Sequence, residues 1–178
     1  TRRSSDLYTL PNAGEVIQAL RNEFQDRLLV GAGTVLDSET ARHAILHGAQ
    51  FIIAPNFSKE AAIMCNRYQI PYAPGCTTLT EALQALEAGA AFIKAFPISD
   101  FYGAKLVSVF KTPIPYMPIL ASGGIDLKNL KDYVTRGVDC CGFGGLLTKG
   151  SSEQIAANAH SIRCLIDEAR QELQTAAE

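Results

Sequence analysis

Residues 49–75 read AQFIIAPNFSKEAAIMCNRYQIPYAPG and combine two strand patterns with one helix pattern. The two ends of this stretch, 49–55 and 70–75, are short apolar runs that close on proline or glycine. Between them, residues 58–68 repeat apolar side chains at helical spacing. A buried strand, a covering helix and another buried strand predict one unit of a parallel sheet covered by helices.

The same alternation continues along the chain at intervals of about 20 to 25 residues, as in successive β-α units. Further apolar runs lie at 27–33, 90–96, 116–122 and 138–144, and further helical patterns lie at 12–24, 37–47, 78–88, 103–110, 126–136 and 151–176. Each apolar run ends in a turn-forming segment, at the strand end where α/β folds bind ligands. The pattern predicts an α/β fold of the (β/α)8 TIM barrel type. A doubly wound open sheet is the alternative, because the period alone does not separate the two.

The length of 178 residues predicts one domain, 1–178. Six strand patterns are found, whereas a closed barrel has eight strands. The first residues predict a turn that leads into a helix. We therefore expect an incomplete barrel from which the N-terminal β-α-β segment is absent.

Charge and cysteine content exclude several classes of protein. Sixteen Lys and Arg residues against eighteen Asp and Glu residues leave a net charge of −2, so neither nucleic acid nor a membrane surface is predicted as a partner. The five cysteines show no CxxC spacing, which predicts free thiols and a cytoplasmic protein. His43 and His47 have a zinc-like spacing, but the HExxH glutamate is missing, so surface histidines are predicted and no metal site.

Lys94 stands out because it interrupts the buried strand pattern of residues 90–97, AAFIKAFP. Burial of an ammonium group is costly, so such a lysine either has a partner or is held neutral. A neutral lysine is the nucleophile for Schiff-base chemistry on a carbonyl group. The structural alternative is a lysine whose stem packs on the strand while its charged head reaches water.

Two glycine-rich segments follow the last two strand patterns, at 122–124 (SGG) and 142–145 (GFGG). Backbone N–H groups can converge there to bind phosphate, as in many barrels. The alternative is a pair of tight turns that need positive φ. Elsewhere, Gly31–Thr34 lacks the third glycine of a dinucleotide site, and Cys76 is predicted to be a small buried thiol.

The chain resembles the 2-keto-3-deoxy-6-phosphogluconate / 4-hydroxy-2-oxoglutarate aldolases in five segments that occur in the same order: GAGTVL (31–36), APN (54–56), PYAPGCTT (71–78), FIKAFP (92–97) and ASGGI (121–125). The resemblance covers essentially the whole chain. It implies a class I, metal-independent lyase of carbohydrate metabolism, without a cofactor, built on a (β/α)8 barrel and assembled as a homotrimer.

The resemblance also implies roles for individual residues. Lys94 matches the lysine that forms the Schiff base, and Phe96 matches the ring beside the imine. Thr34, Pro55 and Pro74 match residues that line the substrate pocket. The loops that bind the distal phosphate or carboxylate are matched by Ser122, Gly123, Gly124, Gly144 and Gly145. The arginine that binds the pyruvyl carboxylate is matched by Arg3. By position alone, Arg3 would end a strand or be a frayed terminal residue.

Three positions depart from the family pattern. The acid/base glutamate would fall two residues before Thr1, and no other matched strand end supplies a carboxylate. Ser122 replaces a common threonine but keeps the hydroxyl group. Gly145 replaces the usual serine, so a side-chain donor to phosphate is lost, which favours a carboxylate substrate such as hydroxyoxoglutarate.

The sequence therefore predicts an aldolase that cleaves a 2-keto-4-hydroxy acid to pyruvate and an aldehyde, through an imine on Lys94. One alternative is a phosphate-binding barrel of another reaction class, which would form no imine with pyruvate. The other is a non-catalytic barrel fragment, whose unpaired strand edges would favour aggregation.

Overall fold

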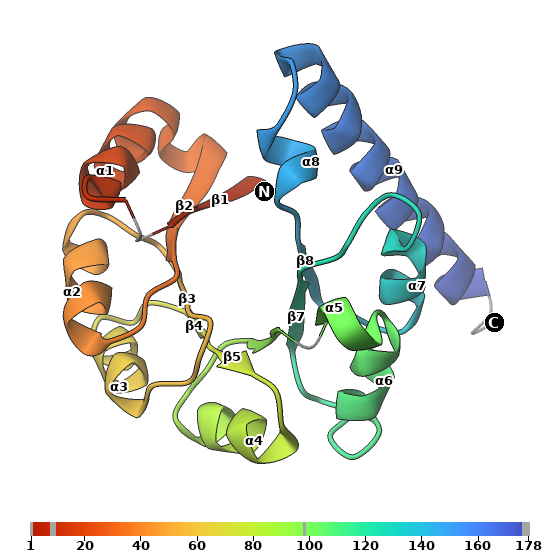
Figure 1. Cartoon of the computed structure of the whole chain (residues 1–178), viewed down its shortest axis with the longest axis horizontal. Helices are drawn as coiled ribbons and strands as arrows, with labels where there is room; N and C mark the ends of the chain where they lie inside the picture. Colours follow the sequence, from red (N-terminus) through yellow and green to blue (C-terminus); the bar gives the residue numbers. More distant parts are fainter. Residues whose placement is uncertain (1, 8–9, 98, 176–178) are drawn as a thin grey trace. The chain divides into compact units, whose positions relative to one another are not determined.

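The computed structural model describes residues 2–7, 10–97 and 99–175, with side chains at 10–97 and 101–175. The chain forms two compact units, Thr1–Lys94 and Ala95–Glu178. Each unit is an alternation of strands and helices (Figure 1). The predicted α/β organisation is therefore confirmed, while the assignment of residues 1–178 to a single domain stays a prediction.

The first unit carries a parallel sheet with the strand order β1-β2-β3-β4. Its elements are β1 (Arg2–Leu7), α1 (Ala13–Phe24), the 3₁₀ turn η1 (Gln25–Arg27), β2 (Leu28–Gly33), α2 (Ser38–Leu46), β3 (Ile52–Ile53), α3 (Lys59–Arg67), β4 (Tyr72–Ala73), β5 (Gly75–Cys76) and α4 (Leu79–Glu87). Ala32, Ile52 and Tyr72 lie level with one another across β2, β3 and β4. This register brings the carboxyl ends of the three strands to one edge of the sheet.

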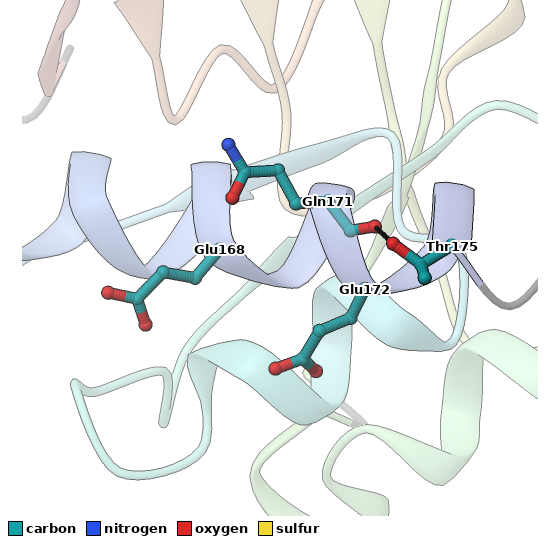
Figure 2. Close-up of a pocket in the computed structure, with 4 residues that line it drawn as sticks. All are labelled: Glu168, Gln171, Glu172 and Thr175. Carbon is teal, nitrogen blue, oxygen red and sulfur yellow. Dashed lines mark hydrogen bonds between the residues drawn. The ribbon is translucent and has the colours of Figure 1, made fainter.

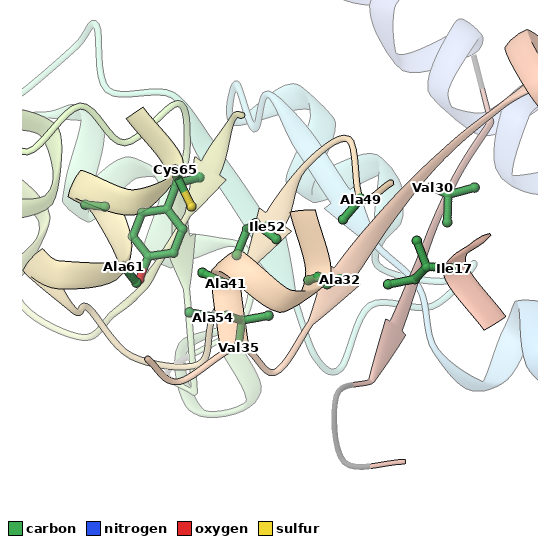
Figure 3. Packing of buried hydrophobic residues seen from close by; sticks show 13 residues of the cluster. Ile17, Val30, Ala32, Val35, Ala41, Ala49, Ile52, Ala54, Ala61 and Cys65 are labelled. Carbon is green, nitrogen blue, oxygen red and sulfur yellow. The ribbon is translucent and has the colours of Figure 1, made fainter. Parts of the chain in front are cut away.

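Alternation along the strands creates the core of this unit. Val30 and Ala32 of β2 and Ile52 of β3 are fully buried, and they belong to one apolar cluster with residues of α1, α2 and α3 (Figure 3). Successive strand residues point to opposite faces, so every second residue meets the helices. The helices contribute small side chains at this contact, which lets them lie close to the sheet: Ala41, Ala44, Ala61, Ala62 and Cys65.

Gly31 lies between Val30 and Ala32 on β2 and contacts an aromatic ring instead of the helices. A Cβ atom on Gly31 would lie 2.4 Å from the ring of Phe51. The glycine therefore gives the aromatic ring of the neighbouring chain segment room to lie over β2. Ile17 of α1 completes the packing on the helix side with no exposed surface.

Helix signals read from the sequence occur where they are expected. The Asp37 carboxylate accepts the N–H of Thr40 at 2.7 Å and caps α2. Thr78 and Glu81 form a reciprocal capping box at the start of α4. Backbone and hydroxyl donors of Thr77 and Thr78 lower the pKa of Glu81, because each hydrogen bond favours its charged form.

The second unit contains a parallel strand pair, β7 and β8, in which Ser122 lies level with Gly142. Its elements are α5 (Ser99–Tyr102), α6 (Lys105–Lys111), β7 (Ile119–Ser122), α7 (Leu130–Thr135), β8 (Cys140–Gly142), α8 (Gly145–Thr148) and α9 (Ser152–Thr175). Strand β6 (Ile93–Ala95) spans the boundary between the units. The Asp139 carboxylate accepts the N–H of Ile119 and pairs with Lys111, which ties the start of β7 to α6.

The structure corrects the prediction for the N-terminal residues. Instead of a turn, Arg2–Leu7 form β1, which pairs in parallel with β2 along its whole length. The segment RRSSDL has no apolar alternation, so its sequence gives no strand signal. It is defined as a strand by backbone pairing with β2.

Two helix boundaries also differ from the prediction. The pattern at 103–110 corresponds to α6, preceded by the separate short helix α5, with Gly103 at a φ of 55° between them. Helix α7 begins only at Leu130, because the Asp126 carboxylate accepts the N–H groups of Lys128 and Asn129 in a turn.

Candidate active site

Lys94 occupies the middle of the short strand β6. Its neighbours Ile93 and Ala95 are 0% and 1% exposed, whereas Lys94 itself is half-buried. Burial lowers the pKa of the Lys94 ammonium group from 10.5, because removal from water disfavours the charged form. The fold therefore increases the fraction of neutral amine at a given pH, and a neutral amine can attack a carbonyl group.

The backbone of the first unit brings Pro74 close to Lys94 and Pro55 close to Gly75. The N–H of Lys94 donates to the carbonyl oxygen of Pro74 at 2.8 Å. The next residue, Gly75, lies so close to β3 that a Cβ atom on it would be 2.0 Å from the carbonyl oxygen of Pro55. The structure thus groups three predicted site residues at one edge of this unit.

Thr34 lies at the same edge. It follows the last residue of β2 and adopts a φ of 61°, the left-handed conformation that turns the chain out of the strand. The next N–H, of Val35, donates to the carbonyl oxygen of Ile53 at 3.2 Å. Thr34 is therefore fixed beside the end of β3, from which Pro55 follows.

Arg3 does not lie where the sequence pattern placed it. It is near the beginning of β1, level with Leu29, rather than at the carboxyl end of a strand. The end of β1 carries Asp6 and Leu7, level with Ala32 and Gly33. No strand was predicted there, because a strand signal in the sequence needs alternating apolar residues. The structure does not describe the side chains of Arg3, Asp6 and Leu7.

The two glycine segments of the second unit lie at one end of the β7–β8 pair. Ser122 ends β7, and its Oγ atom would be 3.1 Å from a Cβ atom on Gly142 of β8. Gly123 and Gly124 have φ values of 96° and 65°, so the turn after β7 itself requires glycine. The amide of Asn129 donates to the carbonyl oxygen of Gly124 at 2.8 Å, which holds this turn against α7.

Gly144 and Gly145 precede and begin α8, and both are exposed. A Cβ atom on Gly144 would meet nothing within 4 Å, and one on Gly145 would make an ordinary contact with Lys149. No neighbouring atom therefore demands glycine at these two positions. Phe96, which follows β6 in the second unit, is half-buried.

Two surface hollows are lined by none of the predicted site residues. One, of about 590 Å³, is lined by four residues of α9 alone: Glu168, Gln171, Glu172 and Thr175 (Figure 2). The other, of about 510 Å³, lies beside α5, α6 and α7 and includes Asn129. A surface provided by a single helix has no opposing wall, so the first hollow is not an enclosed site.

All five cysteines lie among the described residues. Cys65, Cys76, Cys141 and Cys164 are free thiols, and burial raises the pKa of Cys65, Cys76 and Cys141 to about 12 in each case. The prediction of a buried Cys76 is confirmed, since it is 1% exposed. Within the described part of the chain, no helix has the length and apolar character that crossing a membrane requires.

The family model described as KDPG and KHG aldolase matches residues 6–162. The chain belongs to this aldolase family. The match begins after Arg3 and includes the Lys94 strand and both glycine segments. The family resemblance inferred from the sequence motifs is thereby confirmed.

Two curated proteins show the similarity in sequence. The 2-dehydro-3-deoxy-phosphogluconate aldolase of Treponema pallidum is 38% identical to this chain over 122 residues, which are 68% of the chain. The chain spans 58% of the length of that relative. The 2-dehydro-3-deoxy-6-phosphogalactonate aldolase of Escherichia coli is 35% identical over 84% of this chain and 74% of its own length.

Solved structures give the same family assignment. A native KDPGal structure superimposes with a TM-score of 0.88 at 32% identity, covering 94% of this chain and 82% of that one. KDPG aldolase from Legionella pneumophila, described with pyruvate captured as a covalent carbinolamine intermediate, has a TM-score of 0.76 at 25% identity over 93% of this chain and 80% of that one. The aldolase-family chain therefore has the (β/α)8-type fold of these structures.

Proposed function

We propose that this protein is a class I aldolase that cleaves a 2-keto-4-hydroxy acid to pyruvate and an aldehyde, with Lys94 as the Schiff-base residue. The observation that carries the proposal is a lysine held half-buried in a strand, with its pKa lowered by burial, in a member of an aldolase family. The substrates proposed are 2-keto-3-deoxy-6-phosphogluconate, 4-hydroxy-2-oxoglutarate, or both.

The reaction begins when the neutral Nζ atom of Lys94 attacks the C2 carbonyl carbon of the substrate. Loss of water from the carbinolamine gives a protonated imine, which accepts the electron pair of the C3–C4 bond when that bond breaks. A base removes the proton of the C4 hydroxyl group, so the aldehyde leaves. The enamine then takes a proton at C3, and hydrolysis of the imine releases pyruvate and free Lys94.

The proton carrier must be a group near the reacting atoms, and carboxylates working through water are suited to this role.

The remaining predicted residues are proposed to bind the substrate. Thr34, Pro55, Pro74 and Phe96 would shape the pocket around the imine. The turn at Ser122, Gly123 and Gly124 and the segment at Gly144 and Gly145 would bind the distal phosphate or carboxylate. Two observations support the anion site. Both segments follow the same end of the β7–β8 pair, and a Cβ atom on Gly144 would meet no atom within 4 Å.

Trapping with pyruvate and borohydride tests the mechanism directly. The protein should gain about 72 Da, the mass of one reduced pyruvyl imine. The rate of trapping should rise with pH and reach half of its maximum below pH 10.5, because the folded protein lowers the pKa of Lys94. Intact-mass spectrometry of samples quenched at each pH measures both quantities. A folded protein that gains no mass, or a midpoint at or above 10.5, would contradict the proposal.

We also propose that the protein acts as a cytoplasmic homotrimer. The family resemblance supports the trimer, and the free thiols support a reducing compartment. Phe101 and Tyr116 are each 80% exposed, and a neighbouring copy could cover such apolar surface. Sedimentation equilibrium should give three times the chain mass of 19.2 kDa. A mass of one or two chains at micromolar concentration would reject the trimer.

A further inference from the structure

The side chain of Asn129, just before α7, holds the turn that follows β7 at two points. Its Nδ2 atom donates to the carbonyl oxygen of Gly124 at 2.8 Å, and its Oδ1 atom accepts the N–H of Asp126 at 2.9 Å. These two backbone groups flank Ile125, which is 8% exposed. The amide therefore binds the backbone on both sides of a residue whose own side chain is buried.

The glycine pair of this turn has little rigidity of its own. Gly123 and Gly124 have φ values of 96° and 65°, and glycine adopts positive and negative φ about equally readily. The pairing of Ser122 with Gly142 of β8 fixes the start of the glycine pair. The hydrogen bond from Asn129 fixes the direction of the Gly124 carbonyl group at its end.

The direction of this carbonyl group affects how the turn meets an anion. Carbonyl oxygens carry partial negative charge and repel a phosphate or carboxylate, whereas backbone N–H groups bind one. A trans peptide group points its C=O and its N–H to opposite sides. Because the Gly124 carbonyl group is directed at Asn129, the N–H of Ile125 is directed away from it. The Asn129 amide thus occupies a carbonyl oxygen of the turn that would otherwise repel an anion.

The start of α7 does not depend on this amide. The Asp126 carboxylate accepts the N–H of Lys128 at 2.8 Å and that of Asn129 at 3.0 Å, and the N–H of Leu130 donates to the Asp126 carbonyl oxygen at 3.0 Å. These bonds involve only the backbone of Asn129, so they remain when its side chain is shortened. A shortened side chain should therefore loosen the glycine turn and leave the helix in place.

We propose that Asn129 is a positioning residue for the distal phosphate or carboxylate of the substrate. It orients the turn at Ser122, Gly123 and Gly124 through the Gly124 carbonyl group and does not itself contact the anion. This inference rests on the proposed aldolase function, which assigns the same turn to the distal group of the substrate. It adds a residue beyond the glycine segment to the determinants of substrate specificity.

Asn129→Ala tests the proposal with three substrates that share the reacting 2-keto-4-hydroxy end. The substrate 2-keto-3-deoxy-6-phosphogluconate carries a distal phosphate, 4-hydroxy-2-oxoglutarate carries a distal carboxylate, and 4-hydroxy-2-oxobutanoate carries neither. Loss of the hydrogen bond should raise KM about 3–10-fold for the anionic substrate that the protein prefers, with kcat within about twofold. KM for 4-hydroxy-2-oxobutanoate should stay the same.

Asn66→Ala is the matched control. Asn66 also donates its side-chain amide to a backbone carbonyl oxygen at 2.8 Å, that of Ala88, and it belongs to the first unit. The control loses the same kind of hydrogen bond and should leave KM for every substrate unchanged. The proposal would be overturned by an unchanged KM for the anionic substrate in Asn129→Ala. An equal rise in Asn66→Ala, or with 4-hydroxy-2-oxobutanoate, would overturn it as well.

Pyruvate trapping separates a failure of this inference from a failure of the proposed function. Pyruvate has no distal group, so Asn129→Ala and the unsubstituted protein should form the borohydride-reduced adduct at the same rate. If neither protein forms the adduct, the aldolase function is overturned and the role of Asn129 with it. If both form it equally fast and KM is unchanged, only the role of Asn129 is overturned.

Discussion

Replacement of Lys94 by methionine should abolish pyruvate trapping and reduce aldol cleavage at least about 10³-fold, because the nucleophile is removed. Methionine keeps an unbranched apolar stem of similar length, so the packing between Ile93 and Ala95 should survive. Intact-mass spectrometry after borohydride reduction measures the adduct, and coupled detection of pyruvate measures cleavage. Thermal unfolding of the variant verifies that the protein is folded.

Lys131→Ala is the matched control for Lys94→Met. Lys131 pairs with Glu172, which raises the pKa of the Lys131 ammonium group, so this exposed lysine stays charged and unreactive at neutral pH. The control should form the full adduct. An adduct of equal yield in Lys94→Met would show that another amine reacts and would remove Lys94 from the mechanism.

Replacement of Gly75 by alanine should destabilise the protein by about 3 kcal/mol. The added Cβ atom would lie 2.0 Å from the carbonyl oxygen and 2.3 Å from the carbonyl carbon of Pro55. Both are backbone atoms, so no side-chain rotation can relieve the overlap. For a chain of this size the expected loss corresponds to about 6–12 °C in the midpoint of thermal unfolding.

Gly145→Ala is the comparison for stability. Its Cβ atom would meet only the flexible side chain of Lys149, at 3.7 Å, and should change the free energy of unfolding by no more than about 1 kcal/mol. Thermal unfolding of both variants measures the difference. Equal midpoints for the two variants would mean that the strand ends at Pro55 and Gly75 separate easily, contrary to the close packing described above.

Displacement of Gly75 would also change the position of Lys94. The carbonyl oxygen of the preceding Pro74 accepts the N–H of Lys94, so movement of this segment would reach β6. Any Gly75→Ala protein that remains folded should therefore trap pyruvate more slowly than Gly145→Ala. The stability and reactivity predictions thus rest on the same backbone contact.

Local patterns were sufficient for most of the architecture. The buried strand patterns and helical spacings are properties of consecutive residues, and caps such as Asp37 and the pair Thr78 and Glu81 act within one helical turn. The strand at Arg2–Leu7 could not be found in this way, because its polar sequence acquires strand geometry by pairing with β2. Helix α5 (Ser99–Tyr102) likewise lies before the predicted helix of residues 103–110 and was not expected from the sequence.

The sequence by itself determined the α/β alternation, the family and the identity of Lys94 as the candidate nucleophile, because each depends on residue types in a fixed order along the chain. The tertiary structure decided how far Lys94 is buried, that the carbonyl group of Pro74 accepts its N–H, and that Pro55 packs against Gly75. The physical reason is that desolvation and close backbone contact depend on residues about 20 positions apart in the chain, which strand pairing alone brings together.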